Sequence, residues 1–230
     1  MSSDQACLGL LSARLRAKAE PIWQRELEHP FVLGLSNGTL PVESFIYYLR
    51  QDYLFLIEYC RVFALACAKA SDAETMQLFA RLLSDTLGVE MALHRRYCAR
   101  FGISEQDLET TIAAPTTVGY SNHLLAVAYG AGLAEIIAAI LPCQWGYAEI
   151  GSALARKTSA GAEPRYREWI ETYASPDFAA GVEALRALLD RLTQGWPMSA
   201  TEPLQRHFLT SSRFEYLFWE MCYARAGWPL

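Results

Sequence analysis

Two acidic residues stand in stretches of the chain that are otherwise strongly apolar. Asp52 lies in YYLRQDYLFL, residues 47–56, and Glu215 lies in FEYLFW, residues 214–219. Burying a carboxylate is costly unless the group is hydrogen-bonded or paired. Each acid is therefore either a satisfied structural group or part of a cavity in which both acids meet a polar ligand among aromatic rings. The 12 Tyr, 10 Phe and 6 Trp residues supply material for such walls.

Cys143 follows a proline, Pro142, inside an apolar segment. It is either a small core residue or a nucleophile. Proline removes one N–H and crowds the carbonyl four residues back, so we expect a kink just before Cys143, where free N–H groups and the local dipole favour a thiolate. Tyr147 lies one turn further on the same face. Because no histidine is near in sequence, the base must be a spatial partner such as an acid or a tyrosine.

A metal site is the competing interpretation of the acids. Glu90 and His94 are four residues apart, and Glu58 and Glu135 add further carboxylates. Di-iron helical bundles, however, use Glu-x-x-His on two helices, and the sequence has no such motif. We expect Glu90 to orient the His94 imidazole by a hydrogen bond, and we expect no metal and no cofactor.

Composition and charge restrict the class of protein. The 230 residues are 52% hydrophobic and 20% charged, which indicates a globular chain with a sizeable core. The net charge is −5 and the longest basic run is Arg95-Arg96, so we expect no nucleic-acid and no anionic-lipid partner. The start of the chain lacks a secretory signal pattern. The six cysteines form no CxxC pair, which favours reduced thiols, no structural zinc and a cytoplasmic location.

The elements that position these residues are all predicted to be helices. Leu8, Leu11, Leu15, Ala19 and Ile22 mark a first amphipathic helix. Later helices are predicted over about 41–70, about 71–102, 124–143, a short one through residue 169, about 177–193 and about 199–227. Capping boxes at residues 71–74 and 199–202 open two of them. The sequence thus predicts one all-α domain over 1–230, a bundle of about seven to nine helices.

The segment Leu124–Cys143 is long enough to span a bilayer. Glu135 near its centre and the missing Lys/Arg flanks favour a buried core helix instead. We therefore expect no membrane association.

An ordered set of motifs runs from about Trp23 to Trp228, nearly the whole chain. Its residues are His29-Pro30-Phe31-Val32, Gly38-Thr39-Leu40-Pro41, Phe45, Tyr48, Gln51-Asp52-Tyr53, Glu90-Met91-x-Leu93-His94, Pro115-Thr116, Tyr120, His123, Glu135, Leu141-Pro142-Cys143-x-Trp145, Tyr147, Glu149-x-Gly151, Tyr166, Trp169-Ile170, Thr172-Tyr173 and Ser211-Ser212-x-x-Glu215-Tyr216-x-Phe218-Trp219. In this order they resemble the TenA family (thiaminase II, or aminopyrimidine aminohydrolase).

This resemblance implies a haem-oxygenase-like helical fold without haem, usually a homotetramer, that acts in thiamin salvage. The family hydrolyses 4-amino-5-aminomethyl-2-methylpyrimidine to the hydroxymethyl pyrimidine and ammonia, and it can cleave thiamin into pyrimidine and thiazole. Two rival functions stay open. One is an oxygenase on the same fold, and the other is a non-enzymatic regulator, although the acidic chain lacks a basic DNA-reading helix.

The resemblance also assigns roles to residues. Cys143 places the chain in the cysteine-containing class and is the expected nucleophile, while Glu215 exchanges a proton with a ring nitrogen and Asp52 accepts from the 4-amino group. The expected pocket residues are Phe55, Tyr120, Tyr147 and Tyr173, with Tyr147 and Tyr173 supporting the thiol and the acid by hydrogen bonds. Phe55 stands where the family often has tyrosine, so it can stack on a pyrimidine but cannot donate a hydroxyl hydrogen bond.

Overall fold

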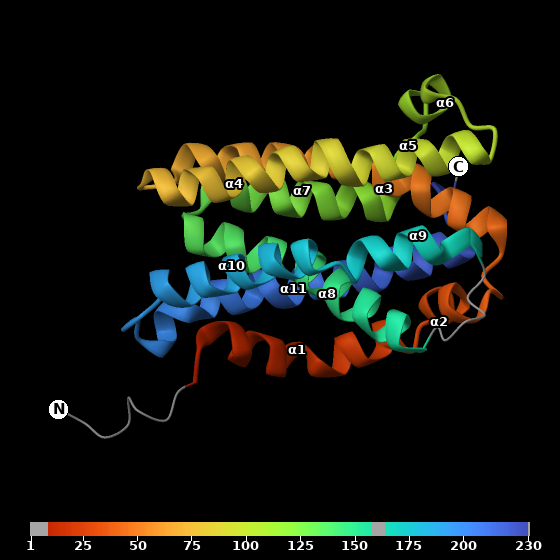
Figure 1. Ribbon diagram of the computed structural model, residues 1–230. Coiled ribbons are helices and arrows are strands. Elements are labelled where there is room, and N and C mark those ends of the chain that lie inside the picture. The colour runs from red at the N-terminus through yellow and green to blue at the C-terminus, as the bar shows by residue number, and fades with distance from the viewer. Residues whose placement is uncertain (1–8, 158–163, 230) are drawn as a thin grey trace.

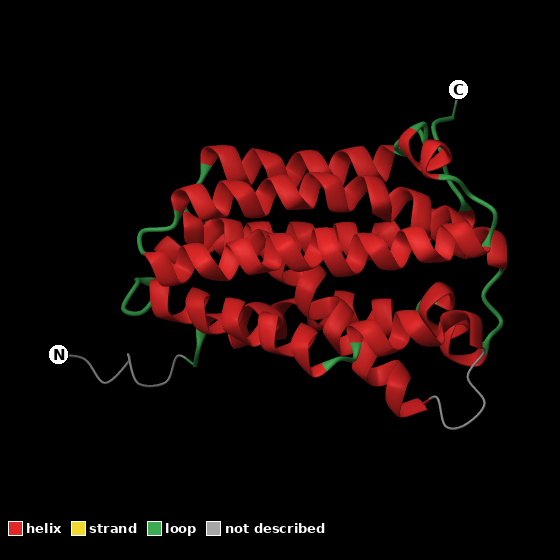
Figure 2. Cartoon of the chain, turned by 45° about the horizontal axis from the view of Figure 1, so that its top comes forward, coloured by secondary structure: helices red, strands yellow, loops and turns green. Residues whose placement is uncertain are grey.

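The computed structural model describes residues 9–157 and 164–229. Every regular element within these two ranges is a helix (Figure 2). In chain order the elements are α1 (Leu11–Leu27), α2 (Pro30–Asn37), α3 (Val42–Lys69), α4 (Ala73–Asp85), the π-helix η2 (Thr86–Glu90), α5 (Met91–Arg100), α6 (Glu105–Glu109), α7 (Pro115–Gly130), α8 (Leu133–Lys157), α9 (Pro164–Tyr173), α10 (Pro176–Leu192) and α11 (Met198–Ala224). The prediction of an all-α chain is therefore confirmed.

The helices form a layered bundle around α8 (Figure 1). Helices α3, α4, α5 and α7 make one layer, α9, α10 and α11 lie next to it, and α1 and α2 cover the opposite side. Helix α8 runs obliquely through the middle and contacts α2, α3, α7, α9, α10 and α11. Residues on α8 are thus placed where side chains from most of the other helices converge.

The long apolar segment predicted as one helix over 124–143 is two helices. Helix α7 ends at Gly130 and α8 begins at Leu133, with Ala131 extended between them. Glycines lower helix stability, and Gly130 and Gly132 flank the break. Glu135 therefore lies in the first turn of α8, where a negative charge is favourable, and not at the centre of a helix. This break and the short helices α2 and α6 explain why the described part of the chain has more helices than the seven to nine predicted.

Neither predicted capping box forms. Helix α4 is capped by Asp72, whose Oδ1 accepts a 2.8 Å hydrogen bond from the Thr75 backbone N–H. A carboxylate there has both the capping geometry and the favourable charge, which displaces Ser71 from the role. Helix α11 begins at Met198, directly after Pro197, so residues 199–202 are already inside the helix. The helix ends near 70, 102 and 193 agree with the prediction to within three residues.

One close backbone approach fixes the position of α9 beside α8. A Cβ added at Gly151 of α8 would lie 2.6 Å from the backbone carbon of Tyr173. Only glycine permits this approach, which sets how near Tyr173, at the end of α9, comes to the middle of the bundle.

Some predicted features lie outside the described residues, namely Cys7, Leu8 and the helix break at Gly161. The five other cysteines are unpaired, and four of them are buried. None of the helices in the two described ranges has the length and hydropathy that a bilayer crossing requires.

Candidate active site

Four side chains from four helical elements meet in the middle of the bundle and are named here the acid–thiol cluster: Asp52, Glu90, Cys143 and Glu215. They come from α3, η2, α8 and α11, and each is less than a tenth exposed. The Cys143 thiol is hydrogen-bonded to Glu215 and to Tyr59, and it lies within electrostatic range of all three acids. The structure thus brings together the three residues predicted to act on the ring, Asp52, Cys143 and Glu215.

Asp52 belongs to a buried hydrogen-bond network. Its Oδ2 accepts a 2.9 Å hydrogen bond from the Tyr48 hydroxyl and lies 2.6 Å from His94 Nε2. Burial alone lowers the pKa of the His94 imidazole, but the hydrogen bond and negative charge of Asp52 outweigh it and raise that pKa. The arrangement is a buried Asp52–His94 pair that holds the Asp52 carboxyl group in one orientation.

His94 is oriented differently from the prediction. Its Nδ1 lies 2.8 Å from the backbone carbonyl of Glu90, and its Nε2 faces Asp52. The Glu90 side chain instead accepts from the hydroxyls of Thr86 (3.0 Å) and Tyr173 (3.4 Å). The i, i+4 spacing correctly predicted a hydrogen bond between Glu90 and His94. The backbone carbonyl of Glu90 makes this bond, so the Glu90 side chain can bond other groups.

Glu215 is a carboxyl group with an elevated pKa. Burial raises its pKa to about 8, the Tyr120 hydrogen bond lowers it and the charge of Asp52 raises it. The Tyr120 hydroxyl donates to Glu215 Oε1 at 2.5 Å. At neutral pH this carboxyl therefore carries a proton that it can give to a base beside it.

The surroundings of Cys143 favour the protonated thiol over the predicted thiolate. Burial raises its pKa well above the ordinary value, and the charges of Glu215, Glu90 and Asp52 raise it further. Cys143 lies more than two turns from either end of α8, so the helix dipole does not reach it. Pro142 is accommodated inside α8 without ending the helix. The thiol must consequently pass its proton to a neighbour when it forms a bond.

Aromatic rings enclose the cluster. Phe55 stacks on Tyr120 with ring centroids 4.8 Å apart, and Tyr147 packs edge-on against Tyr173 at 4.8 Å. All four rings are less than a tenth exposed. The Tyr147 hydroxyl is hydrogen-bonded to Tyr48. The hydroxyls of Tyr147 and Tyr173 thus bond Tyr48 and Glu90, whereas Tyr59 bonds the thiol.

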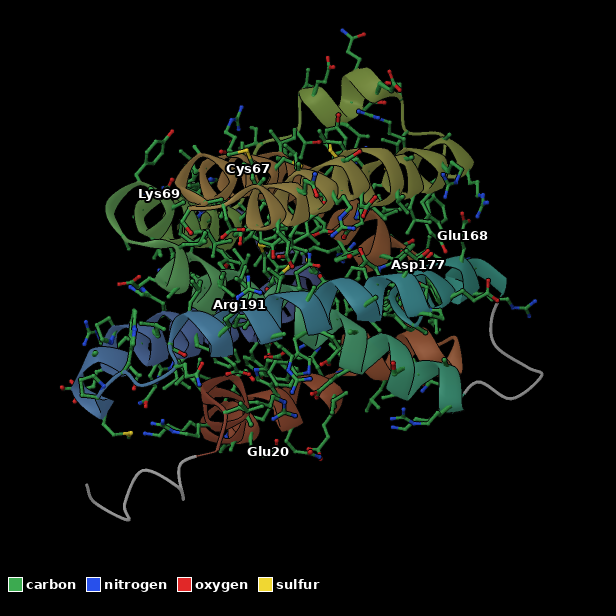
Figure 3. The ribbon with its side chains drawn as sticks, turned by 60° about the vertical axis from the view of Figure 1, so that its left-hand side comes forward. Glu20, Cys67, Lys69, Glu168, Asp177 and Arg191 are labelled. Atoms are coloured by element: carbon green, nitrogen blue, oxygen red, sulfur yellow. The ribbon has the colours of Figure 1, made fainter. Side chains whose placement is uncertain are left out.

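Glu90 lines a cavity that lies beside the acid–thiol cluster. The cavity has a volume of about 300 Å³ and lies between α4, η2, α8, α9 and α10. Glu90 and Gln144 form its inner end, and Asp85 and Asp177 lie at its rim. Figure 3 labels Asp177 at the beginning of α10. Gln144, which directly follows Cys143 in sequence, therefore lines a space connected with the exterior.

Burial moves the pKa of Glu90 less far than that of Glu215. Burial raises it to about 7, the Thr86 hydrogen bond lowers it, and the charge of Asp52 raises it. The wider turn of η2 carries Glu90 inward while its neighbour Val89 stays 53% exposed. π-Helical turns of this kind occur frequently at functional sites.

One buried acid was missed by the sequence analysis. Glu26 of α1 is 2% exposed, and its Oε1 has no hydrogen-bond partner. Burial and the charge of Glu215 raise its pKa well above the ordinary value. A signal was present, because Glu26 continues the inward repeat of Leu15, Ala19 and Trp23. Tyr59 was missed as well, and nothing in its spacing separates it from ordinary core tyrosines.

No group of three or more His, Cys, Asp or Glu side chains within the described ranges is arranged to hold a metal ion. The site is thus built from carboxyl, thiol, imidazole and phenol groups inside aromatic walls.

The fold and the site together define a haem-oxygenase-like helical protein with a buried thiol and acids at its centre. At the level of fold, a protein with a haem-oxygenase-like fold from Shewanella denitrificans OS217 is similar, with a TM-score of 0.74, 11% identity and coverage of 93% of this chain and 92% of that chain. The family model described as the TENA/THI-4/PQQC family matches residues 16–225, and the chain belongs to this family.

Individual relatives agree with this assignment. The chain is 43% identical over 217 residues to a Halalkalibacterium halodurans protein named aminopyrimidine aminohydrolase, covering 94% of this chain and 97% of the relative. It is also similar to a TenA homologue from P. horikoshii OT3, with a TM-score of 0.87, 32% identity and coverage of 94% of this chain and 100% of that chain. The predictions of the TenA family and of its fold are confirmed.

Proposed function

We propose that the protein is an aminopyrimidine aminohydrolase that converts 4-amino-5-aminomethyl-2-methylpyrimidine and water to the hydroxymethyl pyrimidine and ammonia, and that also cleaves thiamin into pyrimidine and thiazole. The observation that carries the proposal is the Cys143–Glu215 hydrogen bond inside aromatic walls. A nucleophile paired with a proton donor fits addition to an aromatic nitrogen heterocycle. The name of the 43% identical relative supports the same reaction.

The first step is addition of Cys143 to the pyrimidine ring. Sγ forms a bond to a ring carbon, and Glu215 gives its proton to the ring nitrogen that receives the displaced electrons. Glu215 takes the thiol proton in exchange, so the carboxyl group ends the step protonated. Because burial raises the pKa of Glu215 to about 8, the donor form is available at neutral pH.

The adduct then exchanges the group on its exocyclic methylene. Electrons of the dearomatised ring expel the amine or the thiazole, and water adds to the methylene carbon. Reversal of the first step returns the sulfur–carbon electron pair to Sγ, the ring proton to Glu215 and a proton to the thiol. Addition followed by elimination divides one difficult displacement into easier steps.

The remaining residues bind and orient the pyrimidine. Both hydrogen bonds to Asp52 described above use Oδ2, so Oδ1 is the oxygen left to accept from the 4-amino group. His94 holds the Asp52 carboxyl group in place through its Nε2 contact with Oδ2. Phe55, Tyr120 and Tyr147 supply aromatic walls for the planar ring.

Release of ammonia and hydroxymethyl pyrimidine from the aminomethyl pyrimidine tests the proposal. We expect wild-type turnover, loss of at least about a thousandfold in Cys143→Ala because the covalent route is removed, and a large loss in Cys143→Ser because a hydroxyl is a poorer nucleophile. Turnover that survives in Cys143→Ala would remove covalent catalysis and keep the substrate. Absence of wild-type turnover despite pyrimidine binding would overturn the function.

We also propose that the protein acts in the cytoplasm as a homotetramer. The described cysteines are unpaired, which fits a reducing compartment. Large apolar side chains such as Leu10, Ile112 and Trp228 are more than half exposed, which fits contacts with further copies of the chain. Light scattering of the purified protein should give about four times the 25.8 kDa chain mass, and a monomer would refute the assembly.

A further inference from the structure

Beyond the ring chemistry, the geometry points to Glu90 as the catalytic base that deprotonates the water attacking the exocyclic methylene, with the cavity above it as the passage through which water enters and ammonia leaves. This inference rests on the proposed function. It concerns a step for which Cys143, Glu215 and Asp52 provide no group, because all three are engaged with the ring.

The position of Glu90 supports this role. Its carboxylate lies at the inner end of the 300 Å³ cavity, together with Gln144, which directly follows Cys143 in the chain. Gln144 is hydrogen-bonded to Tyr59, which also bonds the thiol. The charge of Glu90 acts on the Cys143 thiol, so the Glu90 carboxyl group, which lines the cavity, is within electrostatic range of the sulfur to which the ring is attached.

The hydrogen bonds of Glu90 leave it able to exchange a proton. Thr86 and Tyr173 both donate to it, at 3.0 and 3.4 Å, and no ion pair neutralises it. Hydrogen bonds from these hydroxyl groups stabilise the ionised form of Glu90, whereas burial stabilises its protonated form. Burial raises the pKa of Glu90 to about 7, close to the value that suits a base at neutral pH.

The substrate amine, bound in its ammonium form, leaves the methylene as ammonia and takes both electrons of the carbon–nitrogen bond, and the ring adduct becomes cationic. A water oxygen forms the new carbon–oxygen bond, the displaced electrons return to the ring, and one water proton passes to Glu90. Ammonia then takes that proton, leaves as ammonium through the cavity, and restores the Glu90 carboxylate.

The cavity suits a cationic product. Its rim carries Asp85 and Asp177, and no lysine or arginine is among its lining residues. Negative charge along a passage raises the local concentration of cations. Val89 and Phe178 supply its apolar surface.

Several titratable groups face Glu90 and share its environment. They are Asp52 and Cys60 of α3, His94 of α5, Cys143 of α8, Tyr173 of α9, and, at the rim, Asp85 of α4 and Asp177 of α10. An acidic or basic limb of the pH–rate profile is therefore assigned to Glu90 only if that limb changes when Glu90, or a residue bonded to its side chain, is substituted.

The test is Glu90→Gln assayed with water and with azide as competing nucleophiles. Azide is already anionic and needs no base. We expect hydrolysis to fall about 10²–10⁴-fold and to lose the acidic limb near pH 7, while azidomethyl pyrimidine forms at a rate close to that of the wild type. A merely structural defect would slow both products equally, and that result would overturn the proposal.

Two further variants keep the test decisive. Thr86→Val removes the hydrogen bond that lowers the pKa of Glu90, so the acidic limb should move to higher pH even if Glu90→Gln folds poorly. Glu109→Gln on α6, a helix far from the cavity, makes the same change of charge and should leave rate and profile unchanged (Figure 1). An unmoved limb in Thr86→Val would count against Glu90. If the wild type itself releases no hydroxymethyl pyrimidine, the proposed function fails first.

Discussion

Glu215 and Glu90 are both buried beside Cys143, yet their surroundings differ. On the aromatic side, Glu215 bonds Tyr120, which stacks on Phe55, and none of the three is among the lining residues of the 300 Å³ cavity. On the cavity side, Glu90 meets Thr86 and Tyr173 and reaches the exterior through an open space. One carboxyl is thus suited to exchanging protons with an enclosed ring, and the other with water.

This difference in surroundings fits the two distinct steps proposed for Glu215 and Glu90. Burial raises the pKa of Glu215 to about 8 but that of Glu90 only to about 7. At neutral pH the first is mostly an acid and the second is about half ionised. Neighbouring carboxyls whose environments separate their pKa values are a common basis for assigning acid and base roles.

The largest expected effect comes from removing the acid on the aromatic side. Glu215→Gln cannot give a proton to the ring nitrogen, so kcat should fall about 10²–10⁴-fold. Steady-state release of hydroxymethyl pyrimidine measures it, and a fall of less than about tenfold would show that the ring is activated in another way.

The same variant tests the burial of Glu215 through stability. Because the folded-state pKa of about 8 exceeds the ordinary 4.5, the contribution of this group to stability is fully present below about pH 4.5 and is lost as pH rises toward 8. The free energy of unfolding of the wild type should therefore fall over this range, and that of Glu215→Gln should fall less. Urea unfolding at several pH values measures the difference, and parallel curves would contradict it.

Asp52→Asn should have the next largest effect, on stability. It leaves the buried His94 imidazolium without its partner, and breaking a buried pair costs about 3–5 kcal/mol. Since Asp52 raises the pKa of His94, the loss should be full below pH 6.5 and should shrink as pH rises through the folded-state pKa of His94. Urea unfolding measures it, and the double variant with His94→Gln should lose less than the sum of the single losses.

Tyr120→Phe tests the difference between Glu215 and Glu90 by removing a single hydroxyl group, and its expected effect is smaller. It removes the hydrogen bond that lowers the pKa of Glu215, so the basic limb of the pH–rate profile should move to higher pH. A net loss of about 1 kcal/mol, or about fivefold in kcat/KM, is expected for one hydrogen bond. A basic limb that stays in place would mean that another group supplies the proton.

Phe55→Tyr should have the smallest effect. The side chain is 3% exposed and stacked between Tyr59 and Tyr120, so an added hydroxyl must find a partner within the aromatic side. We expect a few-fold change in kcat/KM, differing between thiamin and the aminomethyl pyrimidine, as a single hydrogen bond allows. Unchanged kinetics on both substrates would show that this position has no part in ligand preference.

The sequence predicted the helices well because their apolar repeats are long. It failed at boundaries where two signals compete, as at Ser71 and Asp72, or where glycines interrupt an apolar run, as at Gly130 and Gly132. At the other end of the chain, Arg225 adopts the left-handed conformation that closes α11, two residues before the expected Gly227.

The site was predictable where a polar residue contradicted its surroundings. Asp52 and Glu215 stood out because acids in apolar runs are unusual. The protonation of Cys143 was not predictable, because its pKa depends first on burial and then on three acids contributed by other helical elements. The contact of Tyr59 with the cluster and the cavity beside Glu90 could not be predicted either, since both depend on how the helices pack.

The distribution of the cluster over the chain has a consequence for folding. Asp52, Glu90 and Cys143 are contributed by α3, η2 and α8, whereas Glu215 belongs to α11, which follows every other helix. Until α11 docks, Glu215 stays hydrated and the other acids lack one side of their enclosure. The electrostatic cost of burying these acids together therefore arises only when α11 docks. A chain interrupted before α11 would contain the thiol but not the acid paired with it.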